Sequence, residues 1–481
     1  MSLLAKVGKN SSLFFLGRSV SAFATVAAIP VYSRLIEPQQ YGLYALVNGV
    51  LLSIVVLSGC GLSSSITRFY HESDPGEITR NAVLAQVVTG AGAVLVLLLL
   101  FPVLLLYSLS EYYQIVATAI PLVLLENLVV VQISFYRIRQ QAVQYAIVSI
   151  VQRWIGIGLT IVLLYLHVGV SSLFIGLAIA DVLLIIYFFF NEWKQSIKLP
   201  ADVGRMKYLL LFGLPVAFDS LIFSVFQLSD RYILGLYHSL SDVGVYSFVY
   251  DIALKVQFLI VLPMTQVVEP MFWIEIKKKG IEHAKKLVSQ STQYFIVFIG
   301  FLSGFIFLYS TDIIRIFASE RYLSHELLLP VLVCAVLLYG VFYVVRIGIF
   351  YAMKTKYLLL VTGSVAAAKI VISFLVIPHY GILAAAFSTL IGYLVLTIVA
   401  YWNSSRFLKI RYSFFRNTVG VAALLLSAYG ISLSLPGGVL LNSIFKGVLY
   451  LIISLVIVTI LFKEIQNIMV KKFSLEFRAG S

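Results

Sequence analysis

The sequence is poor in charge: Asp, Glu, Lys and Arg make up only 12% of its 481 residues, whereas an ordinary soluble domain has about 25%. Hydrophobic residues make up 61% of the chain. A globular protein of this length could not cover its surface with so few charged side chains. The composition therefore excludes a soluble protein and indicates an integral membrane protein.

Cysteine is also scarce, because only Cys60 and Cys334 are present and they lie far apart in apolar runs. Two such residues give neither a disulfide framework nor a metal-ligand pattern, so we expect two small core residues and no metal site. The string Gly8-Lys9-Asn10 lacks the spacing and the Ser or Thr of a Walker A motif. The chain is therefore expected to hydrolyse no ATP and to need no cofactor.

The sequence is instead rich in long apolar runs, of which it has fourteen. About 20 apolar residues cross the ~30 Å hydrocarbon core as a helix, and these runs, with their flanks, are long enough. Runs such as 94–106 lack the period-two alternation of a lipid-facing barrel strand, so we expect an all-α integral membrane protein. The runs are 13–35, 41–66, 81–107, 115–136, 143–166, 173–190, 208–237, 243–268, 294–308, 327–351, 357–377, 382–402, 419–435 and 444–462.

The lysines and arginines are distributed very unevenly along this pattern. Of the 35 Lys and Arg residues, 25 lie in alternate loops and at the two ends of the chain, seven lie inside runs, and three lie in the intervening loops or at a run end beside one. Those three are Arg34, at the end of the first run, Arg315 and Arg321. Because basic loops stay on the cytoplasmic side, we expect both termini to be cytoplasmic. A net charge of +14 that is spread over many loops, and not gathered in a groove, also argues against nucleic-acid binding.

The loops between the runs are short, and none exceeds about 20 residues. They leave no room for a soluble catalytic domain. The segment 272–293 mixes lysines with apolar residues, which predicts an amphipathic helix on the inner membrane face.

Two short patterns recur at matching positions of the chain. A His-x-Gly string begins the sixth run at His167 and the twelfth run at His379. A Gly-x-Tyr string enters the second run at Gly42 and the eighth run at Gly244. Each copy contains six spans, an even number, so both copies have the same orientation in the membrane. They would be related by an axis along the membrane normal. We therefore expect two pseudo-symmetric six-helix lobes with a cleft between them, followed by two further helices and a cytoplasmic tail, at 1–200, 201–405 and 406–481.

Several charged residues lie deep within the runs, where each costs about 2.5–3.5 kcal/mol on insertion scales if it faces lipid. They must therefore face protein or water. A hydrated cleft with cationic walls favours an anionic ligand such as a diphosphate, because Arg and Lys form charge-assisted bonds with phosphate oxygens. The predicted substrate-binding cations are Arg18, Arg153, Lys255, Arg346 and Lys369. Glu126 and Asp219 are candidates for ion coupling or for balancing these cations.

The same charges also have structural interpretations. Asp251 and Lys255 are four residues apart and suit a local ion pair on one helix face. Asp181 matches no position in the expected cleft and is interpreted as structural. Arg18 and Arg346 lie near the cytoplasmic ends of their runs and could extend to the interface.

Several strings in these runs resemble a known family. Together with the number and order of the spans, they resemble the polysaccharide transporter branch of the multidrug/oligosaccharidyl-lipid/polysaccharide (MOP) exporter superfamily, which includes O-antigen and capsule repeat-unit flippases. They mark turns and helix ends, so they indicate the family better than the substrate. The strings are Tyr41-Gly42-Leu43-Tyr44, Gly61-Leu62-Ser63-Ser64-Ser65-Ile66-Thr67-Arg68-Phe69-Tyr70, Gly213-Leu214-Pro215, Leu228-Ser229-Asp230-Arg231-Tyr232-Ile233-Leu234 and Val243-Gly244-Val245-Tyr246-Ser247.

The resemblance implies alternating access by two lobes around a cationic cavity. Its cargo would be an undecaprenyl-diphosphate-linked oligosaccharide that moves from the cytoplasmic to the outer leaflet of the cell inner membrane. The last two helices would flank a groove for the lipid tail. The implied partners are this lipid-linked anionic glycan, membrane lipids, and a polysaccharide polymerase and glycosyltransferases.

The predicted function is thus a flippase for a lipid-linked glycan repeat unit, and not an enzyme. The alternative is a cation-coupled multidrug exporter of the same fold. Such exporters favour acidic or aromatic cavities for cationic drugs, and the excess of deep cations argues against this. A glycan polymerase would usually need a large outer loop with catalytic groups, but the widest outer loop here, at about 309–326, is short.

Overall fold

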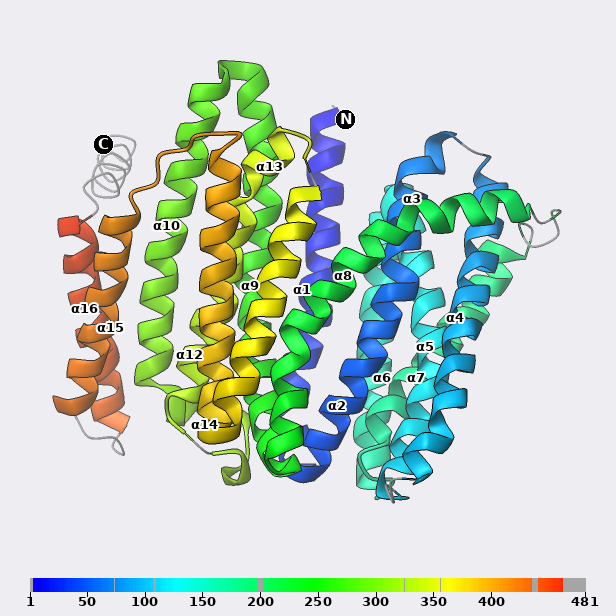
Figure 1. Cartoon of the computed structure of the whole chain (residues 1–481), viewed down its shortest axis with the longest axis horizontal. Helices are drawn as coiled ribbons and strands as arrows, with labels where there is room; N and C mark the ends of the chain where they lie inside the picture. The colour runs from blue at the N-terminus through cyan, green and yellow to red at the C-terminus, as the bar shows by residue number, and fades with distance from the viewer. Residues whose placement is uncertain are drawn as a thin grey trace, which may run out of the picture. The chain divides into compact units, whose positions relative to one another are not determined.

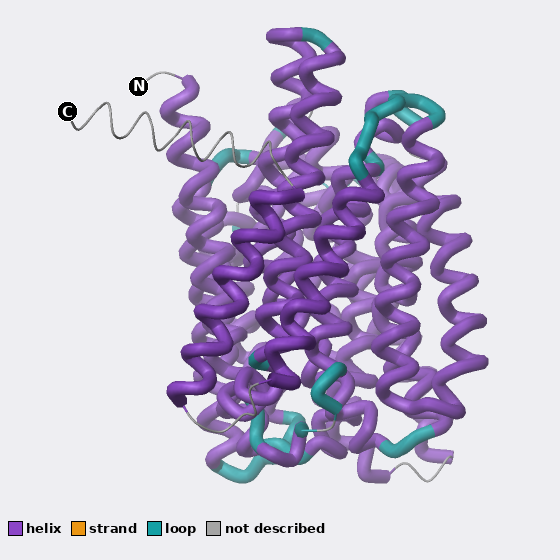
Figure 2. Tube along the Cα trace, turned by 90° about the vertical axis from the view of Figure 1, so that its left-hand side faces the viewer, coloured by secondary structure: helices purple, strands orange, loops and turns teal. Residues whose placement is uncertain are grey.

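The computed structural model describes residues 3–72, 74–106, 110–194, 196, 200, 202–323, 325–354, 356–434 and 440–461. Within these residues the chain forms helices joined by turns and short loops, without a strand (Figure 2). The helices are long and apolar, as the hydropathy pattern predicts. The expectation of an all-α protein is confirmed for this part of the chain.

The chain divides into two compact units. Unit 1 comprises Met1–Phe248, Phe317–Tyr322 and Thr362–Ala385. Unit 2 comprises Val249–Ile316, Leu323–Val361 and Ala386–Ser481. The two units are defined by which segments pack together, whereas the lobes predicted at 1–200, 201–405 and 406–481 are defined by the sequence repeat. The two divisions describe different properties, so the lobe boundaries stay a prediction.

In unit 1, α5 contacts α4, α6 and α7 (Figure 1). Helix α1 contacts α6. These helices bury polar residues such as Asn127 and Gln152 beside their apolar side chains. The elements are α1 (Leu3–Leu35), α2 (Pro38–Val55), the π-helical turn η1 (Val56–Cys60), α3 (Gly61–Phe69), η2 (Tyr70–Glu72), α4 (Pro75–Leu106), α5 (Ser110–Ile138), α6 (Ala142–Tyr165), α7 (Ser172–Phe188), η3 (Phe189–Trp193), α8 (Val203–Tyr237), the beginning of α9 (Leu240–Lys279), η5 (Glu320–Tyr322) and the first part of α14 (Lys356–Ser405).

In unit 2, α10 packs against α12 and α15, and α15 packs against α16 (Figure 1). The elements of this unit are the remainder of α9, α10 (Ile281–Leu308), most of α11 (Ser310–Phe317), α12 (Leu328–Val345), α13 (Ile347–Tyr351), the remainder of α14, α15 (Phe414–Ser434) and α16 (Leu440–Leu461).

Twelve helical segments among the described residues are long and apolar enough to cross a membrane. One of them is α14, whose 50 residues would extend about 75 Å at 1.5 Å per residue, more than twice the hydrocarbon thickness. Its backbone is interrupted at Gly381, so it provides two spans. Helix α1, with 33 residues, is not among the twelve but contains the first predicted run. Counting α14 twice and adding α1 gives the fourteen spans that the sequence predicts.

The prediction of a separate amphipathic helix over 272–293 is wrong. Helix α9 continues to Lys279 and α10 begins at Ile281, so this segment forms the ends of two long helices that meet in a hairpin (Figure 1). Gly280 joins them with φ of 85°, a left-handed value that favours glycine. Buried Phe272, Ala284 and Val288 of the segment share one cluster in unit 2, whereas Trp273 and Ile274 are exposed. The segment is therefore two helix ends and not one separate helix.

The recurring Gly-x-Tyr strings meet in unit 1. A Cβ atom on Gly42 of α2 would overlap the carbonyl oxygen of Leu240, and one on Gly244 of α9 would overlap the carbonyl oxygen of Pro38. Each glycine also lies against the backbone nitrogen of the other. The two helices therefore cross with their backbones in contact, which only glycine permits at these positions.

A second close crossing joins two more of the family strings. A Cβ atom on either Gly61 of α3 or Gly213 of α8 would overlap the backbone of the other residue. One turn further along α3, the Ser65 hydroxyl donates to the Leu209 carbonyl of α8 at 2.6 Å. These contacts explain why small residues stand at these positions.

The segment 317–322 belongs to unit 1 because it is tied to the end of α1. The hydroxyl of Tyr322, which is fully buried, donates to the Ile36 carbonyl at 3.0 Å. The Ser319 hydroxyl donates to the Ser33 carbonyl at 2.9 Å, and the Ser33 hydroxyl is 3.2 Å from the Phe317 carbonyl. These bonds satisfy carbonyl groups in the last turn of α1, which have no partner within the helix.

The two recurring His-x-Gly strings share a backbone feature. Gly169 and Gly381 both have a positive φ, of 83° and 58°. At Gly381 this value ends the first half of α14. The His238 ring donates from Nε2 to the carbonyl of Ile377 at 2.8 Å, just before this break. Both strings therefore place glycine at a positive φ, while His167 of the first string also has a positive φ, of 59°.

Candidate functional site

The deep cation of α6 is held beside an acid of α5. The Arg153 Nη2 atom lies 3.7 Å from Oε1 of Glu126. The Arg153 side chain is 37% exposed and the Glu126 side chain is 16% exposed. A close charge-assisted bond would measure about 2.7–2.9 Å, so this ion pair is loose and leaves donors of the guanidinium available.

A buried acid of α7 is bonded to the residue that precedes Arg153. Asp181 is 0% exposed, and its Oδ1 accepts a hydrogen bond from Nε2 of Gln152 at 2.7 Å. The helices that carry these two groups approach closely, because a Cβ atom on Gly176 of α7 would overlap Thr160 of α6. Helices α5, α6 and α7 of unit 1 therefore carry Glu126, Arg153 and Asp181, with Arg153 beside Glu126 and Gln152 bonded to Asp181.

The deep lysine of α14 is enclosed in unit 1. The Lys369 Nζ atom lies 2.8 Å from Oδ2 of Asp230, and the two side chains are 1% and 0% exposed. Lys369 also donates to the Phe226 carbonyl at 2.6 Å and lies 4.8 Å from the centre of that ring. Ser373 and Tyr246 donate to the Asp230 carboxylate at 2.8 and 3.4 Å. All these groups belong to α8, α9 and the first part of α14.

Arg18 and Asp219 are the other two predicted residues of unit 1. Arg18 of α1 is exposed, whereas Asp219 of α8 is half-buried. Gly17, the neighbour of Arg18, lies so close to α6 that a Cβ atom there would overlap Ala146. The position of Arg18 on α1 is thus fixed by helix packing, while its side chain stays accessible.

In unit 2, Arg346 is surrounded by aromatic rings. It stands at the boundary between α12 and α13, with its guanidinium 3.8 Å from the centre of the Tyr343 ring and 5.5 and 5.1 Å from those of Phe342 and Phe350. Its Nε atom is buried without a hydrogen-bond partner in the described part of the chain. Ring faces attract the cation but accept no strong hydrogen bond, so this guanidinium keeps donors for another acceptor.

Lys255 and Asp251 lie one turn apart on α9, in unit 2, and both are half-buried. The spacing is the one that the sequence predicts for a local pair. Their ion pair stays a prediction.

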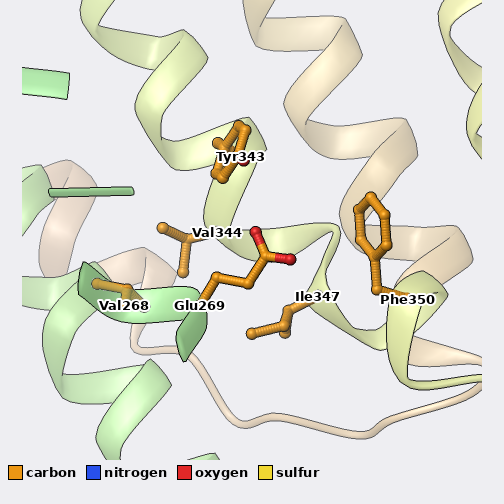
Figure 3. A pocket seen from close by; sticks show the side chains of 6 residues that line it. All are labelled: Val268, Glu269, Tyr343, Val344, Ile347 and Phe350. Carbon is orange, nitrogen blue, oxygen red and sulfur yellow. The ribbon is translucent and has the colours of Figure 1, made fainter. Parts of the chain in front are cut away.

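A small cavity in unit 2 lies close to Arg346. Glu269 extends from α9 toward the α12–α13 segment, where Tyr343, Val344, Ile347 and Phe350 line the space (Figure 3). The cavity has a volume of about 10 Å³, roughly enough for one water molecule. It is too small to hold a sugar or a diphosphate.

No group of three or more His, Cys, Asp or Glu residues in the described part of the chain could hold a metal ion. Glu126 instead faces Arg153, and Asp230 faces Lys369.

The sequence analysis did not identify Asp230 or Gln152 as functional residues. Asp230 was part of a family string but was not paired with Lys369, because nothing local links α8 to α14. Gln152 precedes Arg153 on α6, and its amide was not among the deep charges considered. A search for every polar residue within a run would have found both residues, but not their partners.

Comparison with known families gives one match. The model of the family described as "Polysaccharide biosynthesis protein" matches residues 7–273, which is more than half of the chain. No curated protein matches the chain by sequence.

The fold is similar to several solved structures of membrane transporters. A structure of the lipid II flippase MurJ in an inward closed conformation has a TM-score of 0.73 and 14% identity, covering 95% of this chain and 99% of that one. An inward-facing multidrug resistance MATE family transporter of the MOP superfamily has a TM-score of 0.62 and 16% identity, with 82% and 94% covered. A MOP superfamily transporter from Pyrococcus furiosus Vc1 has a TM-score of 0.58 and 15% identity, with 83% and 95% covered. At these identities the likeness concerns the fold, and the expected MOP-type fold is confirmed.

Proposed function

Since the chain belongs to the polysaccharide biosynthesis protein family, we propose that it is a flippase for a lipid-linked glycan. It would carry an undecaprenyl-diphosphate-linked oligosaccharide repeat unit from the cytoplasmic to the outer leaflet by alternating access. The observation that carries this proposal is the family match over residues 7–273, to which the likeness to a lipid II flippase adds the fold. The work is transport and not catalysis.

The accessible cations of unit 1 support an anionic headgroup as cargo. Arg153 holds Glu126 only loosely, and Arg18 is exposed. A guanidinium with available donors binds phosphate oxygens through two parallel bonds. We therefore propose Arg153 and Arg18 as binding residues for the diphosphate. Arg346 of unit 2, whose buried Nε atom has no hydrogen-bond partner in the described residues, is a separate candidate.

The remaining predicted residues enter the proposal in different ways. Lys255 is retained as a candidate cation and Asp219 as a candidate for ion coupling, because both lie deep within predicted spans. Lys369 can meet an anion only after its contacts with Asp230 and Phe226 break.

The proposed location is the inner membrane of the cell, with both termini cytoplasmic and with glycosyltransferases and a polysaccharide polymerase as partners. On the cytoplasmic side, glycosyltransferases would complete the repeat unit, and on the outer side a polymerase would use it. A cation-coupled multidrug exporter of the same fold is the alternative. Exporters of cationic drugs favour acidic cavities, whereas cations dominate the predicted binding residues.

The decisive experiment concerns Arg153. In a flippase-deficient host, Arg153→Ala should leave the membrane protein level intact and abolish surface glycan, because the diphosphate loses its partner. Arg153→Lys should keep partial transport, since Lys retains the charge but loses the planar fork. The measurement is surface glycan normalised to membrane protein level.

The matched control is Arg205→Ala. Arg205 is also an ion-paired arginine of unit 1, 3.0 Å from Glu77, but it lies at the beginning of α8 and not in the middle of a span. It should keep surface glycan. Normal glycan with Arg153→Ala at normal protein level would refute the role of Arg153. Failure of the wild-type chain to restore glycan, together with acquired resistance to cationic drugs, would favour the exporter.

A further inference from the structure

A polar cavity of about 410 Å³ lies at one end of unit 1. Four segments that are distant in the sequence form it: the turn that leads into α2, the beginning of α5, the turn between α6 and α7, and the beginning of α9. Its volume is within the range of about 300–1,000 Å³ that is usual for small-ligand sites. Neither Arg153 nor Arg18 is among the described residues that line it. The diphosphate site proposed above therefore leaves this cavity without a role.

All four segments belong to the side of the membrane that the loop charges predict to be outer. With a cytoplasmic N-terminus, the loops after the first, third, fifth and seventh apolar runs are outer, and these four loops supply residues to the cavity. A lipid that has been moved to the outer leaflet presents its headgroup on this side. The cavity thus stands where the glycan leaves the protein.

Three glutamines supply polar groups to this cavity. Gln39 and Gln40 belong to the first turn of α2, and Gln114 belongs to the beginning of α5. All three are exposed, and none of their side chains bonds to another residue in the described part of the chain. Each primary amide carries two N–H donors and a carbonyl acceptor. Together the three amides offer both donors and acceptors to a ligand.

The lining carries no uncompensated charge. Glu37 is the one charged residue among the described lining residues, and its Oε1 lies 3.5 Å from Nη1 of Arg321. The segment 317–322, which carries Arg321, is tied to the end of α1 by Tyr322, so this counter-ion belongs to unit 1. A space that is balanced in this way does not select a diphosphate or an organic cation. It suits a neutral polar ligand.

Apolar side chains complete the lining, among them Leu43 and Val168. The cavity therefore combines amides that donate and accept with small apolar surfaces. A neutral sugar ring has the complementary surface, because its hydroxyl groups both donate and accept hydrogen bonds and its C–H faces are apolar. A lipid tail would leave the amides without partners.

The walls of the cavity are held by contacts described above for the fold. Leu240, which lines the cavity, places its carbonyl where a Cβ atom on Gly42 would stand, so the beginnings of α2 and α9 are in backbone contact. In the α6–α7 turn, Gly169 has φ of 83° and its carbonyl accepts a bond from the Ser172 hydroxyl at 2.6 Å. A site with walls fixed before binding loses little conformational freedom when a ligand enters.

We propose that this cavity binds a neutral sugar residue of the cargo glycan on the outer side of the membrane. The assignment rests on the proposed function for the glycan and on the loop charges for the side. Gln39, Gln40 and Gln114 exchange hydrogen bonds with the sugar hydroxyls, while Leu43 and Val168 pack against a C–H face. Because the cavity contacts sugar and not diphosphate, it gives the carrier selectivity for the repeat unit, which the cations alone do not provide.

The test uses the purified full chain in lipid nanodiscs and saturation-transfer NMR. The probes are glucose, galactose, mannose, rhamnose and N-acetylglucosamine, with glucuronic acid as the charged comparison. At least one neutral sugar should bind to the wild type, and glucuronic acid should bind no more tightly. Gln40→Ala and Gln114→Ala should each weaken binding of that sugar about fivefold, the usual effect of losing one hydrogen bond.

Val168→Trp provides an arm that removes no polar group. Val168 is 42% exposed at the cavity, so a larger side chain fills the space without entering a packed core, and binding should be lost. The matched control is Gln144→Ala, which removes an exposed glutamine at the beginning of α6, the end of that helix away from the cavity. It should keep the wild-type affinity. The thermal unfolding midpoint of each variant checks that the protein is folded.

The outcomes separate this site from the proposed function. Binding that the three cavity variants weaken and Gln144→Ala keeps supports the site. Absence of binding of every neutral sugar to the wild type, equal binding to all variants, or binding of glucuronic acid alone overturns the site and leaves the flippase intact. The flippase is tested separately by surface glycan in the flippase-deficient host. Failure there, with sugar binding intact, overturns the flippase and not the sugar site.

Discussion

The ammonium group of Lys369 is enclosed on every side that the structure describes. It meets the carboxylate of Asp230, the carbonyl of Phe226 and the face of the Phe226 ring. Asp230 in turn accepts bonds from Ser373 and Tyr246. Burying both charges is costly, but each has several partners, and removing only one charge would leave the other uncompensated. The contacts point to a structural pair, in contrast to Arg153, which keeps donors available.

We therefore predict that Lys369→Met or Asp230→Asn alone destabilises the protein by about 3–5 kcal/mol, because a buried charge is left unpaired. The double variant should recover most of this loss, since it buries no net charge. The measurements are the membrane protein level and the thermal unfolding midpoint in detergent. Lys279→Met is the control, because Lys279 pairs with Glu275 while 61% exposed, and such surface pairs contribute about 0–1 kcal/mol. Wild-type stability of Lys369→Met with lost transport would instead assign Lys369 to the substrate.

At the level of helices, glycine determines which spans can touch. The crossings of α2 with α9 and of α3 with α8 bring backbones together at Gly42, Gly244, Gly61 and Gly213. Without a hydrophobic driving force in lipid, helices associate through close packing, and small residues allow it. The family strings that contain these glycines are therefore contact sites between helices as well as helix ends.

Gly42→Ala and Gly244→Ala should each destabilise unit 1, because the new methyl group overlaps a backbone carbonyl that cannot rotate away. We expect a loss of about 1–3 kcal/mol or more, the usual cost of overpacking. The measurement is the thermal unfolding midpoint together with the amount of folded protein. Gly158→Ala is the matched control on α6, since a Cβ atom there meets nothing within 4 Å. Equal behaviour of all three variants would contradict the crossing.

At the level of the whole chain, the loop charges predict the orientation. Twenty-five Lys and Arg residues lie in loops or ends assigned to one side and three on the other. The described structure has helices of spanning length, but orientation depends on how the loops interact with the membrane and its machinery. The cytoplasmic location of both termini is therefore open to direct measurement.

Reporter fusions should place Ser239 and Ser434 outside and Lys278 and Lys409 inside the cell. The physical reason is that positively charged loops are retained in the cytoplasm during insertion. Paired phosphatase and fluorescent-protein fusions report the two sides. Lys278 is the most informative site, because the α9–α10 hairpin ends beside it at Gly280. An outside signal there would contradict the orientation.

The helical class and the spans follow from the sequence alone, because crossing about 30 Å of hydrocarbon depends only on the local length and polarity of a segment. The prediction failed locally at 272–293, where the mixed lysines and apolar residues belong to the ends of α9 and α10 and not to one separate helix. The sequence also identified Arg153, Lys369 and Glu126 as deep charges, since depth follows from position in a run.

Which of these charges meet depends on the tertiary structure. Lys369 pairs with Asp230 across a long stretch of chain, and Asp181, interpreted from the sequence as simply structural, accepts a hydrogen bond from Gln152, the neighbour of Arg153. A charge buried in a span must find a partner, but the sequence does not say which helix supplies it. The partner depends on how each helix is rotated about its axis and where it crosses its neighbours. Close contacts such as Gly42 with Gly244 and Gly176 with Thr160 set this rotation and crossing, and they exist only in the folded chain.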